Sequence, residues 1–295
     1  MEKNNKEKYV ITCWKKYKSI DGLPRNISVE IEDESANQPV EFNVDKFAEL
    51  YYLPKSKVND SFELLKWLDR TCKWVEESIY KDCKKETWTC KDVFRILAWK
   101  AGKINHKESL KYENNIVYYD NWNEGKDNNS IIKLQMPHQR VIGLEEFKPV
   151  AEEIIKIRKQ YCSNKNKNQV WDSLINLVNG ERTSDSMRGI GTVYLITLLH
   201  FITEGECPIY DQFAMASLVS LKLRDLSVSM PIDSIVRGCG LPDKSNERKL
   251  KYMLDKDSEY GKYCKLLEEF FPKGKWKNRK VDQALWVYGH LFRVE

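Results

Sequence analysis

An aspartate and a pair of glycines are the residues of this chain whose types and spacing could support chemistry. Gly189 and Gly191 flank Ile190 just before a strongly apolar stretch, and Asp211 follows that stretch. Two closely spaced glycines favour a sharp turn with positive φ, which leaves backbone amides exposed. Because amides at the start of a helix bind phosphate, the pattern predicts an anion-binding hairpin followed, one helix later, by a carboxylate.

The stretch between these residues must form the element that supports both of them. It is apolar on nearly every face, which predicts a helix over 192–204 buried inside a bundle. Asp211 precedes the apolar run 213–218 and so stands at a natural N-cap, where backbone donors orient its carboxylate. Two plainer interpretations stay open: Asp211 as a purely structural cap, and the glycines as an ordinary turn between helices.

Two short motifs and the closing segment of the chain resemble the helix-hairpin-helix (HhH-GPD) DNA glycosylase superfamily, and within it the 8-oxoguanine DNA glycosylase-like fold. Residues 187–191, Met-Arg-Gly-Ile-Gly, are similar to the family's hairpin, and Tyr210-Asp211 is similar to the pair that carries its catalytic aspartate. The segment 281–290 is similar to its last core helix, whose early residues help to wall the base pocket. The resemblance covers roughly 140–295 and is sharpest at 187–214.

The resemblance implies a DNA glycosylase that acts on double-stranded DNA containing a damaged or modified base and hydrolyses its N-glycosidic bond. Asp211 would be the catalytic carboxylate. Val193 stands where strand-cleaving members have a lysine, so the implied enzyme is monofunctional. Arg188 replaces the usual proline of the hairpin. The residues implied to bind the DNA phosphate are Gly189, Ile190, Gly191 and Thr192.

Gln283 is the residue that the resemblance places in the base pocket, and Trp286 lies on the same segment. For Trp286, packing into the protein core is the competing interpretation. His200 is interpreted as a core histidine rather than an acid or a ligand. A non-catalytic helix-hairpin-helix DNA-binding protein is the alternative to the glycosylase, and an unrelated helical protein with an accidental hairpin is a third interpretation.

The cysteines and histidines indicate no metal cofactor. The 8 cysteines contain no C-x-x-C pair, and only Cys239 and Cys264 follow Asp211, which is too few for the four-cysteine iron–sulfur cluster of some glycosylases. No histidine has a partner at metal-ligand spacing. We therefore expect no iron–sulfur cluster and no catalytic metal, while family analogy allows a monovalent cation at the hairpin carbonyls.

Composition predicts a cytoplasmic globular protein. No apolar run approaches the ~20 residues that span a bilayer, the first eight residues are polar, and no membrane partner is expected. The net charge of +5 is small beside 49 basic and 44 acidic residues, so local clusters say more about nucleic acid. There are two such clusters, and each is either phosphate-binding or merely solvated. The first contains Lys156, Arg158, Lys159, Lys165 and Lys167. The second contains Lys273, Lys275, Lys277, Arg279 and Lys280, with Trp276 among them.

The patterning predicts a mainly α protein: a helix-hairpin-helix glycosylase-like bundle with a small β-containing N-terminal part. Strand-like pieces occur at 9–14 and 27–31, and 104–142 is typical of a hairpin or loop. We place a soft boundary near 140, between an N-terminal part (1–140) and a glycosylase-like helical domain (141–295). The expected helices are about 44–53, 61–80, 90–102, 145–162, 169–179, 192–204, 211–223, 246–270 and 280–293.

Overall fold

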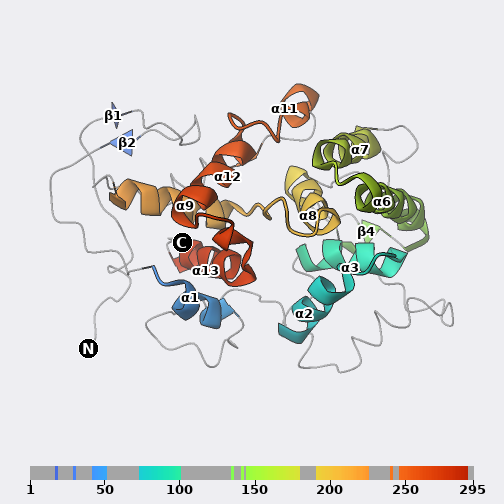
Figure 1. Ribbon diagram of the computed structural model, residues 1–295, viewed down its shortest axis with the longest axis horizontal. Helices are drawn as coiled ribbons and strands as arrows, with labels where there is room; N and C mark the ends of the chain where they lie inside the picture. Colours follow the sequence, from blue (N-terminus) through green and yellow to red (C-terminus); the bar gives the residue numbers. More distant parts are fainter. Residues whose placement is uncertain are drawn as a thin grey trace. The chain divides into compact units, whose positions relative to one another are not determined.

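The protein is mainly α-helical, as the hydrophobic periodicity predicts (Figure 1). The computed structural model describes residues 17–18, 29–30, 42–51, 73–100, 134–135, 141–142, 144–179, 191–225, 240–241 and 246–291. Within these ranges, no helix combines the length and apolarity that crossing a membrane requires. The chain divides into two units, each assembled from segments that are distant in sequence.

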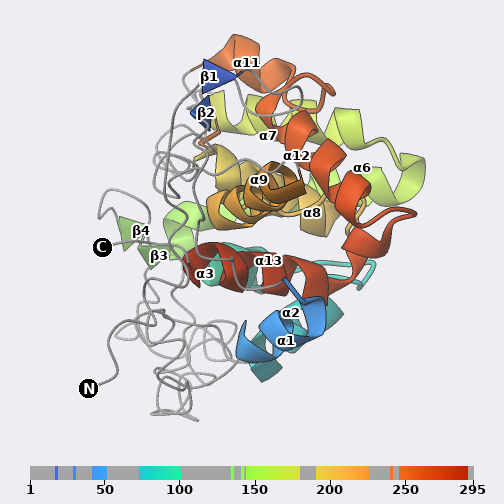
Figure 2. The same cartoon turned by 90° about the vertical axis from the view of Figure 1, so that its left-hand side faces the viewer.

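The first unit comprises residues 1–68, 210–241 and 252–295. Its elements are β1 (Tyr17–Lys18), β2 (Val29–Glu30), α1 (Val44–Tyr51), α9 (Gln212–Asp225), α12 (Glu259–Phe270), the 3₁₀ helix η5 (Lys275–Lys277) and α13 (Arg279–Leu291). The two short strands pair antiparallel. Helix α13 packs against both α1 and α9 and lies between them (Figure 2), while α12 packs against α9 and η5.

The second unit comprises residues 69–209 and 242–251. Its elements are α2 (Lys73–Asp82), α3 (Cys90–Lys100), β3 (Leu134–Gln135), β4 (Val141–Ile142), α6 (Leu144–Asn164), α7 (Lys167–Asn179), α8 (Thr192–Ile202) and α11 (Glu247–Lys251). Strands β3 and β4 pair antiparallel. Helix α8 contacts α3, α6 and α7 and forms the centre of this unit. The boundary expected near residue 140 falls among residues outside the described part and stays a prediction.

Helix α8 confirms the prediction of a buried helix. Leu195, Leu198 and Leu199 are fully buried, and Thr192 and Thr197 are buried with them. The Thr197 hydroxyl donates to the Val193 carbonyl oxygen at 2.9 Å, so its polar group is satisfied within the helix. The burial of most of the helix, with only Val193, Tyr194 and His200 half-buried, follows from its apolar composition, since a helix without a polar face is stable only inside a core.

The single helix expected over 246–270 is wrong, because residues 252–258 form a turn between α11 and α12. Ser258 is the N-cap of α12, and its hydroxyl oxygen accepts from the Gly261 amide at 2.8 Å. Gly261 lets the turn pack closely, since a Cβ there would lie 2.0 Å from the Asp255 carbonyl oxygen. The expected strand at 9–14 and the helix start at residue 61 lie outside the described residues.

Candidate functional site

Asp211 immediately precedes α9 and caps it, as its position before an apolar run predicts. Its Oδ1 accepts a hydrogen bond from the Phe213 amide at 2.9 Å, and its carbonyl oxygen accepts from the Met215 amide at 2.9 Å. These bonds orient the carboxylate at the positive end of the helix dipole. The side chain is partly exposed, so the structure presents a fixed, partly solvated carboxylate at this point.

Aromatic residues surround the start of α9. The rings of Tyr210 and Tyr263 lie 5.0 Å apart, edge to face, and both side chains are buried. Burial raises the pKa of Tyr263, and the negative charge of Asp211 raises it further against the opposing charge of Arg279. Tyr263 therefore stays a neutral phenol in the electrostatic neighbourhood of Asp211.

Helix α13 is held tightly against the first turns of α9. Gly289 makes this approach possible, because a Cβ at that position would lie 2.1 Å from the Phe213 carbonyl oxygen. The Ser217 hydroxyl also donates to the Leu285 carbonyl oxygen at 2.6 Å. The close contact fixes the helix that carries Gln283 and Trp286 on the helix that Asp211 caps.

The two residues predicted for the base pocket lie on α13, in the same unit as Asp211. Gln283 is buried, with 5 % of its surface exposed. Trp286 is half-buried and packs edge to face on Tyr51 of α1, at 5.3 Å between centroids. The Arg279 guanidinium lies over the same tyrosine ring at 5.3 Å. Trp286 therefore takes part in core packing, and its role toward a base stays a prediction.

The hairpin glycines are described only at their C-terminal end. Gly191 is the N-cap residue of α8, and with φ −85° and ψ 170° it is extended. The expected positive φ is therefore wrong for Gly191. As the N-cap it has an extended conformation with negative φ, which any residue can adopt. Thr192 opens the helix and is buried, while Gly189 and Ile190 lie outside the described residues. Gly191 and Thr192 belong to the second unit and Asp211 to the first.

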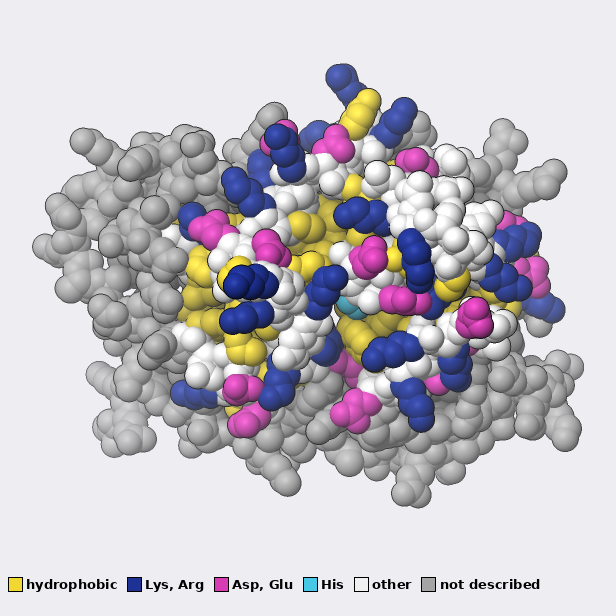
Figure 3. Space-filling view, viewed as in Figure 1, with side chains coloured by type: hydrophobic (Ala, Val, Ile, Leu, Met, Phe, Trp, Pro, Cys, Tyr) yellow, Lys and Arg dark blue, Asp and Glu magenta, His cyan; other side chains and the backbone are white. Residues whose placement is uncertain are grey.

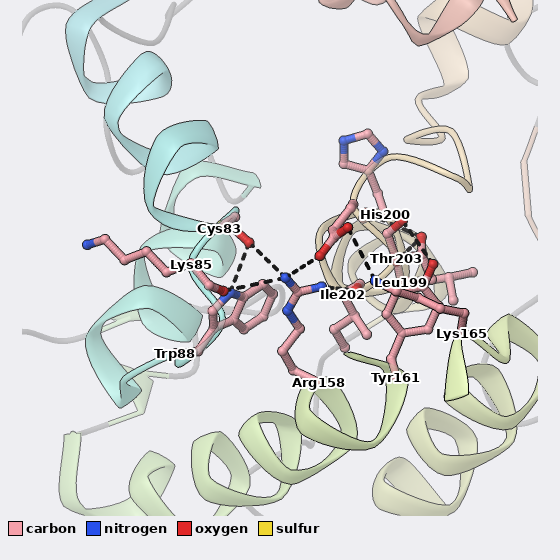
Figure 4. Close-up of polar contacts among 11 residues, drawn as sticks. Cys83, Lys85, Trp88, Arg158, Tyr161, Lys165, Leu199, His200, Ile202 and Thr203 are labelled. Atoms are coloured by element: carbon pink, nitrogen blue, oxygen red, sulfur yellow. Dashed lines mark hydrogen bonds and ion pairs between the residues drawn. The ribbon is translucent and has the colours of Figure 1, made fainter. Parts of the chain in front are cut away.

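Arg158 of α6 forms a buried polar centre that sequence reasoning missed (Figure 4). Its guanidinium donates to the Ile202 carbonyl oxygen at 2.6 Å and to Glu204 Oε1 at 2.7 Å. It also lies 5.4 Å from the ring of Trp88. Neither of the two interpretations offered for this cluster, phosphate binding or a solvated helix face, is right for Arg158, because its side chain is only 1 % exposed.

A pattern in the sequence could have revealed this role. Arg158 lies four residues after Ile154 and three before Tyr161, and both neighbours are fully buried. An arginine on the apolar face of an amphipathic helix must find hydrogen-bond acceptors on the elements packed against that face, because an unpaired buried charge is costly. Because Lys156 and Lys159 lie close to Arg158 in sequence, the segment is easily interpreted as a basic cluster, although Arg158 itself has the spacing of a buried residue.

Arg158 acts on the turn that follows α8. Glu204 and Gly205 have left-handed φ angles of 55° and 85°. Burial favours the protonated form of Glu204, but hydrogen bonds from Arg158 and Lys165 and their charges outweigh it and hold the pKa of this carboxyl below its usual range. His200 Nδ1 lies 2.8 Å from the Cys207 carbonyl oxygen and closes the turn. This contact agrees with the interpretation of His200 as a core histidine.

Two further features of the described residues bear on metal binding and on thiol chemistry. Among these residues, no three His, Cys, Asp or Glu side chains gather closely enough to hold a metal ion. Burial, with the charge of Asp92 as the next cause, raises the pKa of the Cys83 thiol far above neutrality. Cys83 is therefore a structural thiol rather than a nucleophile.

Comparison of the chain with protein-family models, with curated proteins and with solved structures found no match. The assignment of function consequently depends on the residues themselves and on their arrangement.

Proposed function

We propose that this protein is a monofunctional DNA glycosylase of the helix-hairpin-helix type, which hydrolyses the N-glycosidic bond of a damaged or modified base in duplex DNA. The observation that carries the proposal is the Asp211 carboxylate, oriented by the Phe213 amide at the start of α9. It follows, at the spacing expected, a predominantly apolar helix that begins at Thr192 with Gly191 as its N-cap. The finer fold, a glycosylase-like bundle with a small β-containing N-terminal part, belongs to the same proposal.

The proposed reaction needs one fixed carboxylate more than any other group. Once the damaged nucleotide has left the base stack, breakage of the glycosidic bond develops positive charge on the deoxyribose. Asp211 stabilises this charge and accepts a proton from the attacking water. Its orientation is set before the reaction because Oδ1 is held by a backbone donor, so little reorganisation is needed.

The absence of a lysine at position 193 determines the products. Val193 forms no Schiff base, so water rather than an amine attacks the sugar. The products are a free base and an intact strand with an abasic site. The resemblance assigns the binding of a phosphate to the backbone of residues 189–192, and a contribution to the base pocket to Gln283 and Trp286.

A non-catalytic DNA-binding protein is the second candidate function, and one observation favours it. The hydrogen bond from the Phe213 amide gives Asp211 a complete structural role as an N-cap. A cap of this kind stabilises a helix by about 1 kcal/mol without any chemistry. The two candidates differ in whether the negative charge of Asp211 is needed, and a charge-removing substitution that keeps the cap separates them.

The test is a base-release assay with duplexes that carry 8-oxoguanine, uracil, an alkylated purine or mismatched adenine. Alkali is added to one half of each reaction, since abasic strands break only then. Asp211→Asn keeps the cap and loses the charge, because asparagine caps as well as aspartate. Asp172→Asn, at an exposed position of α7, is the matched control.

We expect alkali-dependent cleavage by the wild type and the control on at least one duplex, and a loss of about 100-fold or more with Asp211→Asn. Cleavage without alkali would refute a monofunctional enzyme. Tight, salt-sensitive binding with no base release would move the protein to the non-catalytic class. A protein that neither releases a base nor binds DNA would refute both candidates.

A further inference from the structure

We infer that residues 272–277, which we call the lysine turn, bind the sugar-phosphate backbone of duplex DNA; this inference rests on the proposed function. The turn connects α12 to α13 and includes the 3₁₀ helix η5. It carries three exposed lysines, Lys273, Lys275 and Lys277, with Trp276 among them.

The backbone of the lysine turn is internally hydrogen-bonded. Lys273 and Gly274 have consecutive left-handed φ angles of 59° and 70°. The Lys275 amide donates to the Pro272 carbonyl oxygen at 3.3 Å, and the Lys277 amide donates to the Gly274 carbonyl oxygen at 3.0 Å. A non-glycine residue keeps a left-handed conformation only where its surroundings hold it there. The backbone from which the three lysine side chains project therefore forms a scaffold of defined conformation.

Glu268 of α12 anchors this scaffold with both of its carboxylate oxygens. Oε1 accepts from the Lys273 amide and Oε2 from the Trp276 indole Nε1, each at 2.7 Å. The carboxylate therefore bonds a backbone group and a neutral ring rather than a lysine ammonium. The anchor orders the turn without pairing any lysine ammonium with a carboxylate, and the Lys277 ammonium lies over the Trp276 ring, 5.6 Å from its centroid.

The three lysines differ from the other basic residues close to them in sequence. Lys280 pairs with Asp45 at 2.8 Å, and Arg279 pairs with Asp282. Within the described ranges, by contrast, no carboxylate pairs with Lys273, Lys275 or Lys277. On the face in Figure 3, basic and acidic side chains of the described residues are mixed.

The chemistry of the turn fits a polyanion and not a single small anion. Three ammonium groups on long, exposed stems enclose no cavity, but they can each approach a different phosphate along a strand. The Trp276 indole N–H is already bonded to Glu268, so it is not available to read a base edge. The expected contact is therefore electrostatic and independent of base sequence.

The test compares two triple variants that remove the same charge. Lys273→Gln, Lys275→Gln and Lys277→Gln together change the lysine turn. Lys81→Gln, Lys84→Gln and Lys148→Gln together change exposed lysines of the other unit that lie outside both basic clusters, and none of them has an ion-pair partner among the described residues. Binding of each protein to an undamaged duplex is measured by fluorescence anisotropy at several NaCl concentrations, after urea unfolding has shown that both variants fold.

We expect the slope of log K against log salt to become less steep by about 2 to 3 in the lysine-turn variant, since each phosphate contact contributes about 0.9. The control should keep the wild-type slope within about 0.5. An unchanged slope in the lysine-turn variant, or an equal change in both, would overturn the inference while leaving the proposed function intact. A wild type with no salt-dependent binding would overturn the proposed function as well.

Discussion

Replacing Arg158 with methionine should destabilise the second unit by about 3 kcal/mol. The substitution keeps the length and helix propensity of the side chain but removes its charge and its donors. The loss has two main sources, the hydrogen bonds to the Ile202 carbonyl oxygen and to Glu204. A hydrogen bond from a charged group contributes about 1.5–3 kcal/mol, and an unsatisfied buried carbonyl costs about 1–3 kcal/mol.

Three features keep the expected loss near the lower end of the 3–5 kcal/mol typical of broken buried pairs. The Glu204 side chain is 41 % exposed, so water solvates it once Arg158 is gone. The Cys83 carbonyl oxygen keeps the indole N–H of Trp88 at 3.1 Å. Arg158 Nε, finally, is buried without a hydrogen-bond partner in the described structure, so the native state already bears part of the desolvation cost.

Urea unfolding followed by circular dichroism measures this loss, with tryptophan fluorescence as a second probe because Trp88 lies beside the guanidinium. Lys159→Met, on the exposed side of the same helix, is the control and should change the unfolding free energy by less than about 0.5 kcal/mol. Arg158→Lys keeps the charge but loses the two-pronged geometry, so we expect an intermediate loss. A loss below about 1 kcal/mol for Arg158→Met would refute the assigned role.

Two further predictions concern stability. Gly289→Ala should lower the melting temperature although alanine is the better helix former, because its Cβ would meet the Phe213 carbonyl oxygen at 2.1 Å and separate α13 from α9; an unchanged or higher melting temperature would contradict the close contact. The depressed pKa of Glu204 predicts that its stabilising contribution is complete above the ordinary glutamate pKa and disappears as pH falls through the lower, folded-state value. The difference in unfolding free energy between wild type and Arg158→Met, measured from pH 7 to pH 3, should therefore shrink in acid, and a constant difference would argue against the ion pair.

Local patterns determined part of this protein directly. The apolar composition of 192–202 specifies a buried helix, and Asp211 before an apolar run specifies an N-cap. Both predictions succeed because the interactions that decide them lie within one or two helical turns of chain. The same reasoning fails at 252–258, where the cap by Ser258 and the close contact at Gly261 end a pattern that periodicity alone would continue.

Long-range contacts decided the rest. Arg158 looks like a member of a basic surface cluster, yet its acceptors come from Ile202, 44 residues away, and from Cys83, 75 residues away. No local pattern specifies those carbonyl groups, because their position depends on how α6, α8 and the end of α2 pack. The tightness of α13 against α9 likewise depends on Gly289 meeting Phe213. Sequence thus determines what a residue can do within its own helix, and tertiary structure determines which buried groups it must satisfy.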